Sequence, residues 1–397
     1  MANIFQKLYH KDLQKTYRGF TASGGDIILD NVIGDIPDLQ VYFEDLRKNI
    51  LPESKILISY HNPMWEPILT LASKLGLRKK VGIQNWLDQE DLKNILDLSG
   101  FEVISSQKRF FGITAITNAR SKNQITRTKH VASSKHKEYS VSIIVPARNE
   151  EGNIPKIIPS IPKFGKWQEI IFVEGNSTDQ TWEEVKKIVD YGLMNKKKGR
   201  KKGDYKRSLA SQSPGRLEIK AYKQTGKGKA DAVRLGFEKA TGDILMIYDA
   251  DRTVPSSDLP KFYKVLSGGT GEFANGSRLV YPMEGQAMQT LNKMGNQFFS
   301  SIFTKIFGQH FKDTLCGTKA LFRKDFLRMK KDYLKYLDVD PFGDFALIFS
   351  VIKHNLKVIE IPVRYKERVY GSTNINRFYH GLLLFKMTAI AFREFKL

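Results

Sequence analysis

Residues 243–251 have the sequence DILMIYDAD, in which an apolar run is followed at once by two aspartates. The run 243–248 predicts a buried strand, after which Asp249 and Asp251 would lie on the same side of an extended segment, about 7 Å apart. Two hard oxygen ligands at the end of a strand can bind Mg²⁺ or Mn²⁺. An isolated triplet of this kind is common in surface turns, but unpaired carboxylates are unfavourable beside a buried strand. The position of the triplet therefore favours a metal site.

Strands and helices alternate on the N-terminal side of this run. Predicted strands cover 140–145, 169–173 and 217–222, and predicted helices cover 154–161, 182–190 and 230–240. Such alternation is typical of an α/β fold with a mostly parallel sheet, which binds ligands at the carboxyl ends of its strands. In the loop QTGKGKADA, glycines allow close approach of a phosphate, and Lys227 and Lys229 can neutralise one.

Length and composition limit the possible classes of protein. A chain of 397 residues, 41% of them hydrophobic, is long enough for two domains and too apolar for general disorder. Its one cysteine, Cys316, excludes an internal disulfide or a cysteine-based zinc site and favours a small core residue. The first residues lack the apolar core of a signal peptide, and Lys386 interrupts the apolar stretch 381–392. A soluble or membrane-surface protein is expected.

The net charge of +22 is concentrated in two polar segments. Residues 120–137 contribute +6 and residues 195–216 contribute +8. Because both segments are poor in aromatic residues, we interpret them as a solvated linker and loop, and expect no nucleic-acid partner. Attraction to anionic lipid headgroups, about 1 kcal/mol for each basic residue near the surface, remains an alternative.

The N-terminal part has its own pattern of elements. Strands are expected at 26–30 and 55–60, helices at 39–51, 64–76 and 88–98, and a β-hairpin at 101–117. This order over residues 20–117, with the segment ILDNVIGDIPDLQVYFEDLRKNILPESKILISYHN, resembles the second half of a class I S-adenosylmethionine-dependent methyltransferase. The family's Gly-rich cofactor turn is missing, and Gly24-Gly25 is not that motif, so no methyl transfer is expected. The expected domains are a partial methyltransferase-like α/β domain at 1–117, a basic linker at 118–137 and a catalytic domain at 138–397.

Eight segments of the catalytic part occur in the order found in glycosyltransferase family 2, the inverting nucleotide-sugar enzymes with the GT-A fold. The segments are VPARNEE, EGNSTDQT, TGKGKADAVRLGFEKATGD, YDAD, NGSR, CGTKALFRKDF, FGDF and IPVRYKERVYGSTNI. They span roughly residues 138–376, and the chain is most similar to the dolichyl- or polyprenyl-phosphate sugar transferases. The resemblance implies a Rossmann-like GT-A domain, a nucleoside-diphosphate sugar donor, and Mg²⁺ or Mn²⁺ as cofactor.

The resemblance also implies roles on the donor side. It places three residues, Pro146, Arg148 and Glu150, around the nucleoside. Glu174 would contact base or ribose and Asp179 would brace its loop. Asp249 would bridge ribose and metal, and Asp251 would coordinate the metal. Arg278 would face the sugar or diphosphate. Arg368 would meet the diphosphate and, with Lys227 and the metal, would stabilise the leaving charge.

On the acceptor side, Asp344 stands where the family has its candidate general base. It could instead cap the helix that follows, just as Arg278 could be a structural ion-pair partner and Lys229 a solvated side chain. The chain departs from the family at Glu174-Gly175, where paired aspartates are frequent, and at 372–374, where Ser-Thr-Asn replaces a Ser-Lys pair.

The C-terminal segment 375–397 predicts an amphipathic helix. Its apolar stripe consists of Phe378, Leu382, Phe385, Ala389 and Phe392. Packing on the catalytic domain and binding to a membrane surface both explain such a stripe.

The sequence therefore predicts an inverting, metal-dependent glycosyltransferase, peripheral at the cytoplasmic face of a membrane, with a polyprenyl phosphate or growing glycan as acceptor. A surface-polysaccharide transferase with a hydroxyl acceptor and a non-catalytic binder of anionic membrane or polymer are the alternatives.

Overall fold

The computed structural model describes residues 27–30, 32–51, 54–76, 84–109, 114–122, 138–197, 217–283, 290–340, 342–371 and 377–395. The chain divides into two compact units. Unit 1 contains residues 1–135 and 280–282, and unit 2 contains residues 136–279 and 283–397. Most of the two basic segments and all of Ser372-Thr373-Asn374 lie outside the described residues.

Unit 1 is a four-stranded sheet with helices. Its elements are β1 (Ile27–Asp30), η1 (Ile33–Asp35), α2 (Leu39–Asn49), β2 (Lys55–His61), η2 (Pro63–Trp65), α3 (Glu66–Lys74), α4 (Gln89–Leu98), β3 (Phe101–Arg109) and β4 (Thr114–Ser121). The strand order is β1-β2-β4-β3, with β1 parallel to β2 and the other pairs antiparallel. Asp88 caps α4 as predicted, because its side chain accepts a hydrogen bond from the Asp91 amide.

Two features of unit 1 differ from the sequence expectation. β4 continues to Ser121, so residues 118–121, expected as linker, are strand; the inward-facing Ala115, Thr117 and Ala119 carry the two-residue period past position 117. In addition, Val280 and Tyr281 belong to the core of unit 1, where the Tyr281 hydroxyl accepts a hydrogen bond from the Leu39 amide at 3.2 Å. Three residues far along the sequence therefore complete this unit.

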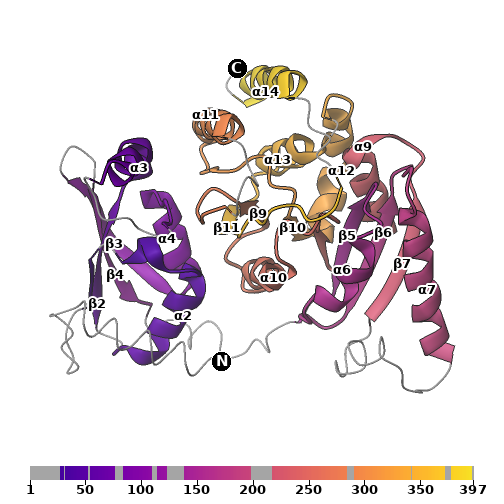
Figure 1. Ribbon diagram of the computed structural model, residues 1–397, viewed down its shortest axis with the longest axis horizontal. Coiled ribbons are helices and arrows are strands. Elements are labelled where there is room, and N and C mark those ends of the chain that lie inside the picture. The colour runs from indigo at the N-terminus through magenta and orange to yellow at the C-terminus, as the bar shows by residue number, and fades with distance from the viewer. Residues whose placement is uncertain are drawn as a thin grey trace. The chain divides into compact units, whose positions relative to one another are not determined.

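Unit 2 is a seven-stranded sheet with helices on its faces (Figure 1). Its first half contains β5 (Val141–Ala147), α6 (Ile154–Ser160), β6 (Gln168–Glu174), α7 (Thr181–Lys197), β7 (Leu217–Lys223), α9 (Gly228–Lys239), β8 (Ile244–Ile247), η3 (Ser256–Asp258) and α10 (Leu259–Ser267). Its second half contains β9 (Phe273–Ser277), α11 (Thr290–Phe307), β10 (Lys319–Phe322), α12 (Arg323–Leu337), α13 (Asp344–Lys353), β11 (Val358–Pro362) and α14 (Arg377–Phe395).

The strand order of this sheet is β11-β9-β10-β8-β5-β6-β7. Only β10 runs antiparallel to its neighbours, so the prediction of a mostly parallel sheet is confirmed. β6 and β8 are buried along their whole length and β5 almost so, as expected for parallel strands covered on both faces. The loops that leave the carboxyl ends of β5, β6 and β8 therefore start from one edge of the sheet.

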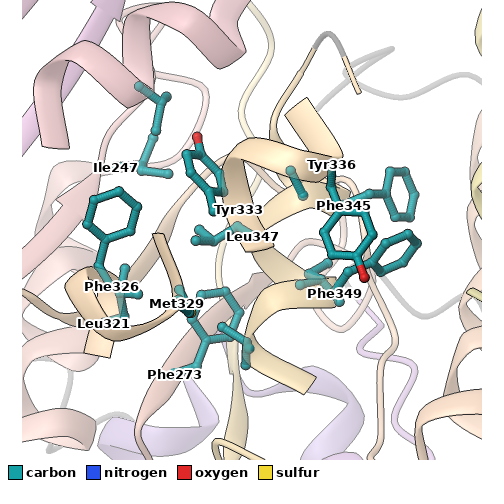
Figure 2. Packing of buried hydrophobic residues seen from close by; sticks show 14 of the residues in the cluster. Ile247, Phe273, Leu321, Phe326, Met329, Tyr333, Tyr336, Phe345, Leu347 and Phe349 are labelled. Atoms are coloured by element: carbon teal, nitrogen blue, oxygen red, sulfur yellow. The ribbon is translucent and has the colours of Figure 1, made fainter. Parts of the chain in front are cut away.

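The main core of unit 2 lies between these strands and the helices α9, α12 and α13. Figure 2 shows how Phe326, Met329 and Tyr333 of α12 and Phe345 and Phe349 of α13 pack with strand residues. α13 is buried from its first residue almost to its end, because α14 packs over it and against α11. The acceptor-side residue Asp344 is thus the first residue of a buried helix.

The C-terminal helix α14 packs by a different stripe from the one predicted. Leu383, Met387 and Ala391 are buried, whereas the predicted Leu382, Phe385, Ala389 and Phe392 are exposed. The side chain of Phe378 lies outside the described part of the chain. Among the described helices, none has the combination of length and apolarity that crossing a bilayer requires.

Candidate active site

Three loops of unit 2 meet around the guanidinium group of Arg368. Its Nη1 donates to Glu150 Oε1 at 2.8 Å, and its Nη2 donates to Asp251 Oδ2 at 2.6 Å. Glu150 follows β5, Asp251 follows β8, and Arg368 follows β11, so residues 218 and 117 positions apart are joined. The structure therefore brings together three of the residues predicted for the donor site.

The loops after β5 and β6 hold each other in place. Asn149 has a left-handed backbone (φ 56°), and its side-chain oxygen accepts a hydrogen bond from the Thr178 amide at 2.8 Å. The Glu150 amide donates to Thr181 Oγ1 at 2.8 Å, and that hydroxyl donates to Asp179. Asp179 is thus connected to the Glu150 backbone through Thr181, whereas the resemblance implied that it braces the loop of Glu174.

The two aspartates of the 249–251 triplet are not on an extended segment. β8 ends at Ile247, residues 250 and 251 form a turn, and Arg252 has a left-handed backbone (φ 58°). The predicted spacing of about 7 Å, which assumed strand geometry, therefore does not apply. Asp251 Oδ1 instead accepts two hydrogen bonds from Thr253, from the amide at 3.1 Å and the hydroxyl at 2.9 Å, so local bonding sets its orientation.

Asp249 has its own cationic partner, Lys229, at the start of α9. The two side chains form an ion pair with an Nζ–Oδ1 distance of 2.6 Å. Burial alone would lower the pKa of Lys229, but Asp249 and then Asp344 outweigh it and raise that pKa above its usual value. Lys229 is therefore ion-paired and only 24% exposed, which does not fit the alternative of a solvated side chain.

Gly317, in the loop before β10, leaves room for this ion pair. A Cβ atom at position 317 would overlap both Asp249 Oδ2 and Lys229 Nζ. We expect Gly317→Ala to displace the pair and lower the rate of the reaction at this site about 100-fold, the order of effect expected when a reacting group is misplaced by about 1 Å. Steady-state kinetics measures this change.

Gly295→Ala is the matched control, because a Cβ atom there meets nothing within 4 Å. It should keep wild-type activity and stability. Wild-type kinetics in Gly317→Ala would contradict the importance of this close approach.

Asp344 occupies a second ion pair, with a lysine that the sequence analysis did not single out. Lys319 of β10 is fully buried, and its Nζ donates to Asp344 Oδ1 at 2.7 Å and also to the Cys316 carbonyl. The N-cap residue of α13 is Gly343, not Asp344, and the Asp340 carboxylate accepts hydrogen bonds from the Phe342 and Ala346 amides. Burial, and after it the charge of Asp344, raise the pKa of Asp340 to about 6.

The other predicted residues lie outside these ion pairs. Glu174 is buried and accepts a hydrogen bond from the Ser177 amide at 2.5 Å, so it braces its own loop. Pro146 is half-buried at the end of β5, and Arg148 and Lys227 are exposed. Their predicted contacts with a nucleotide remain predictions.

Arg278 forms an ion pair, as one of the two alternatives left open expects, and its contact with the sugar or diphosphate stays a prediction. Its Nε and Nη2 bind the two carboxylate oxygens of Asp313 at 2.6 and 2.8 Å, and its guanidinium lies 5.0 Å from the ring centre of Tyr365. Asp313 is fully buried, which would raise its pKa, but Arg278 lowers that pKa to about 2. Both carboxylate oxygens of Asp313 are therefore engaged by Arg278.

Glu150 makes the free energy of unfolding depend on pH. Burial and the charge of Asp251 raise its pKa, against the opposing effects of Asn153 and Arg368, from the usual 4.5 to about 7. Between these values the folded chain binds more protons than the unfolded chain, so the free energy of unfolding falls as the pH rises. Relative to Glu150→Gln, the wild type should lose up to about 3 kcal/mol between pH 4.5 and 8. Urea denaturation across this range tests the sign, and parallel curves would contradict it.

Sequence reasoning missed Lys229 as a partner of Asp249, and also Asp313, Gly317, Lys319 and Asp340. Lys319 carried a usable signal, since a lysine next to the apolar run 320–322 must be buried with the strand and needs a counter-ion. Asp340 and Asp313 carried none, because their partners are set by the folded chain.

Comparison with known proteins bears on the class of protein to which the catalytic part is similar. Residues 142–329, a little under half of the chain, match the model of the family described as Glycosyl transferase family 2. This match agrees with the family resemblance of the catalytic part. The match begins at residue 142 and therefore does not include β1 to β4.

The relatives are named as transferases, and two of the three below carry dolichol or dolichyl phosphate in their names. Glycosyltransferase AglJ of Haloferax volcanii is 27% identical over 249 residues, 62% of this chain and 70% of that protein. Dolichol-phosphate mannosyltransferase of Pyrococcus furiosus is 26% identical over 59% of each chain, so less than two thirds of that protein is spanned. UDP-N-acetylglucosamine–dolichyl-phosphate N-acetylglucosaminyltransferase of Methanococcus voltae is 24% identical over 62% of this chain and 96% of that protein.

Among solved structures, the mannosyltransferase PcManGT from Pyrobaculum calidifontis in complex with GDP-Man and Mn²⁺ is similar, with 18% identity and a TM-score of 0.43 over 68% of this chain and 70% of that one.

Proposed function

We propose that this chain is an inverting glycosyltransferase that moves a sugar from a nucleoside-diphosphate sugar to a polyprenyl phosphate. The observation that carries the proposal is the cluster in which Arg368 joins Glu150 and Asp251, because it gathers acidic and basic groups of three loops at the carboxyl edge of the sheet. The relatives, which include transferases named for dolichyl-phosphate acceptors, support the same class of substrates.

On the donor side, the chemistry requires stabilisation of a leaving diphosphate. Carboxylates of Asp249 and Asp251 are hard oxygen donors, and cations already lie against both, so these residues fit Mg²⁺ or Mn²⁺. When bound, the metal would supply positive charge to the diphosphate. Arg368 and Lys229 lie where they can add to that charge, and such preorganised electrostatics is usually the largest catalytic contribution.

On the acceptor side, the Lys319–Asp344 pair favours a phosphate over a sugar hydroxyl. A hydroxyl acceptor must lose a proton to a general base, whereas a phosphate is already ionised and needs only to be positioned. One oxygen of Asp344 is engaged by Lys319, which suits a positioning role. Transfer to a hydroxyl of a growing glycan or surface polysaccharide is the second candidate, and the acceptor screen below distinguishes the two.

The exposed face formed by α11 and α14 suits a membrane surface. The large exposed apolar side chains of these helices are Phe298, Leu382, Phe385 and Phe392. The Phe299 ring contacts two of them, Phe298 and Phe385, and so connects the two helices. Exposed basic side chains, Lys305, Lys386 and Arg393, accompany them. The acidic residue of α14, Glu394, is engaged by Lys335 and Tyr336. We propose that this apolar and basic face binds anionic lipid and brings the enzyme to the cytoplasmic face of the membrane.

Loss of apolar contacts should weaken this binding. We expect Leu382→Ser combined with Phe392→Ser to weaken binding to vesicles containing anionic lipid at least tenfold, since burial of each side chain contributes about 1.5–3 kcal/mol when complete. Vesicle co-sedimentation measures the change. Leu327→Ser, at an exposed leucine of α12, is the control and should bind normally. Equal binding by all three proteins would rule out this face.

The test of the function is a screen of nucleoside-diphosphate sugars with Mn²⁺, read out as nucleoside diphosphate release. We expect one donor to be consumed much faster when polyprenyl phosphate is added. Stimulation by a saccharide instead would favour the hydroxyl acceptor. No consumption of any donor, together with anionic-polymer binding that tracks the lysines of 195–207 and falls steeply with salt, would favour the non-catalytic binder.

For unit 1 we propose a partial methyltransferase-like domain without methyl transfer. The element order β1-α2-β2-α3-α4-β3-β4 agrees with the one on which the resemblance rested. Calorimetry with S-adenosylmethionine should detect no binding, and micromolar binding would overturn this proposal.

A further inference from the structure

Each aspartate of the 249–251 triplet is held by a cation from another part of the chain. Lys229 Nζ lies 2.6 Å from Asp249 Oδ1, and Arg368 Nη2 lies 2.6 Å from Asp251 Oδ2. The remaining oxygen of Asp251, Oδ1, accepts the two hydrogen bonds from Thr253. A divalent cation bound at Asp249 Oδ1 or at Asp251 would therefore compete with these side chains for the carboxylate oxygens.

The charges of the cluster add a second constraint. Three carboxylates, those of Glu150, Asp249 and Asp251, face two cations, so the cluster carries about one negative charge when Glu150 is ionised. A divalent ion alone would reverse that sign among side chains that are at most 30% exposed. A diphosphate with two ionised oxygens would restore it, and unlike charges at such distances interact strongly in a partly buried site.

We propose that Lys229 and Arg368 are resident counter-ions that couple metal binding to donor binding. Each gives up its carboxylate to the metal and takes a diphosphate oxygen in exchange, so that metal and diphosphate bind tightly only together. Lys229 has a further acidic neighbour, because Asp344 also acts on it electrostatically. This inference rests on the metal-assisted donor binding proposed above and adds the two residues that make it cooperative.

The experiment is a calorimetric titration of the full chain with Mn²⁺, with and without GDP or UDP. In the wild type, the nucleoside diphosphate should tighten Mn²⁺ binding by about tenfold or more, a coupling of the usual size. In Lys229→Met, Mn²⁺ alone should bind more tightly than in the wild type, because its competitor is gone. The same variant should bind the nucleoside diphosphate more weakly without metal, and the coupling should shrink.

Arg368→Met repeats the test at Asp251, and it replaces Lys229→Met as the test variant if Lys229→Met does not fold. Lys239→Met, at an exposed lysine at the other end of α9, is the matched control and should keep wild-type values. If the wild type binds neither ligand, the proposed function fails. If it binds both but folded variants show unchanged or weaker Mn²⁺ binding with full coupling, the function stands and the counter-ion role is overturned.

Discussion

Asp251→Asn is expected to lower kcat/KM for sugar transfer by at least a thousandfold, about 4 kcal/mol of transition-state stabilisation. The carboxylate of Asp251 meets Arg368 at 2.6 Å and is the proposed ligand of the metal on the diphosphate. An amide of the same shape has no charge to attract the metal, and its NH₂ group cannot accept the hydrogen bond of the guanidinium. The loss should therefore appear in metal and donor binding as well as in turnover.

Asp332→Asn is the matched control for this experiment. Asp332 lies in α12 of the same unit, where it pairs with Lys353 at 2.6 Å and with His354 at 2.9 Å, away from the described donor cluster. Its loss should leave the kinetics unchanged. An Asp251→Asn enzyme that kept more than a tenth of wild-type kcat/KM would remove the metal role from this residue.

The second large effect concerns stability. Lys319→Met should lower the free energy of unfolding of unit 2 by about 3–5 kcal/mol, the usual result of removing one partner of a buried ion pair. Lys319 is completely buried and Asp344 nearly so, so the substitution leaves a carboxylate and the Cys316 carbonyl without their donor. Urea denaturation measures the change.

A double-mutant cycle separates the ion pair from general packing. Adding Asp344→Leu to Lys319→Met should recover most of the lost stability, because neither charge is then left alone. If the double variant instead lost the sum of the unfolding free energies lost by the two single variants, the two side chains would not depend on each other. The double variant should nevertheless be a poor transferase, since the proposed acceptor-side carboxylate is gone.

Most elements of the fold were predictable because their patterns are local. The strands β5, β6 and β8 were predicted within two residues by short apolar runs, and Asp88 was a recognisable cap of α4. α14 was predicted as a helix, but its packing face was not. The helix carries two apolar stripes, one containing Leu382 and one containing Leu383, and helical periodicity alone does not say which stripe finds a partner.

The site was predictable only in part. The triplet at 249–251 and the polar loops after β5 and β6 marked the donor edge, because polar side chains directly after buried strands have few structural explanations. The family resemblance implied that Arg368 meets the diphosphate, but it did not indicate that Arg368 pairs with Glu150 and Asp251. The turn after β8 overrode the strand geometry that the sequence suggested, since Thr253 and Arg368 fix Asp251.

The primary structure by itself determined the alternation of strands and helices in the catalytic part, the acidic pair at the end of the buried run, and the surplus of basic residues. These are properties of neighbouring residues, encoded in periodicity and composition. Only the tertiary structure decided which charges pair: Lys319 with Asp344, Lys229 with Asp249, and Arg368 with Asp251. It also decided that Tyr281 completes the core of unit 1. Some of these contacts join residues more than two hundred positions apart in the sequence. A buried charge pairs with whichever partner the folded backbone brings within reach.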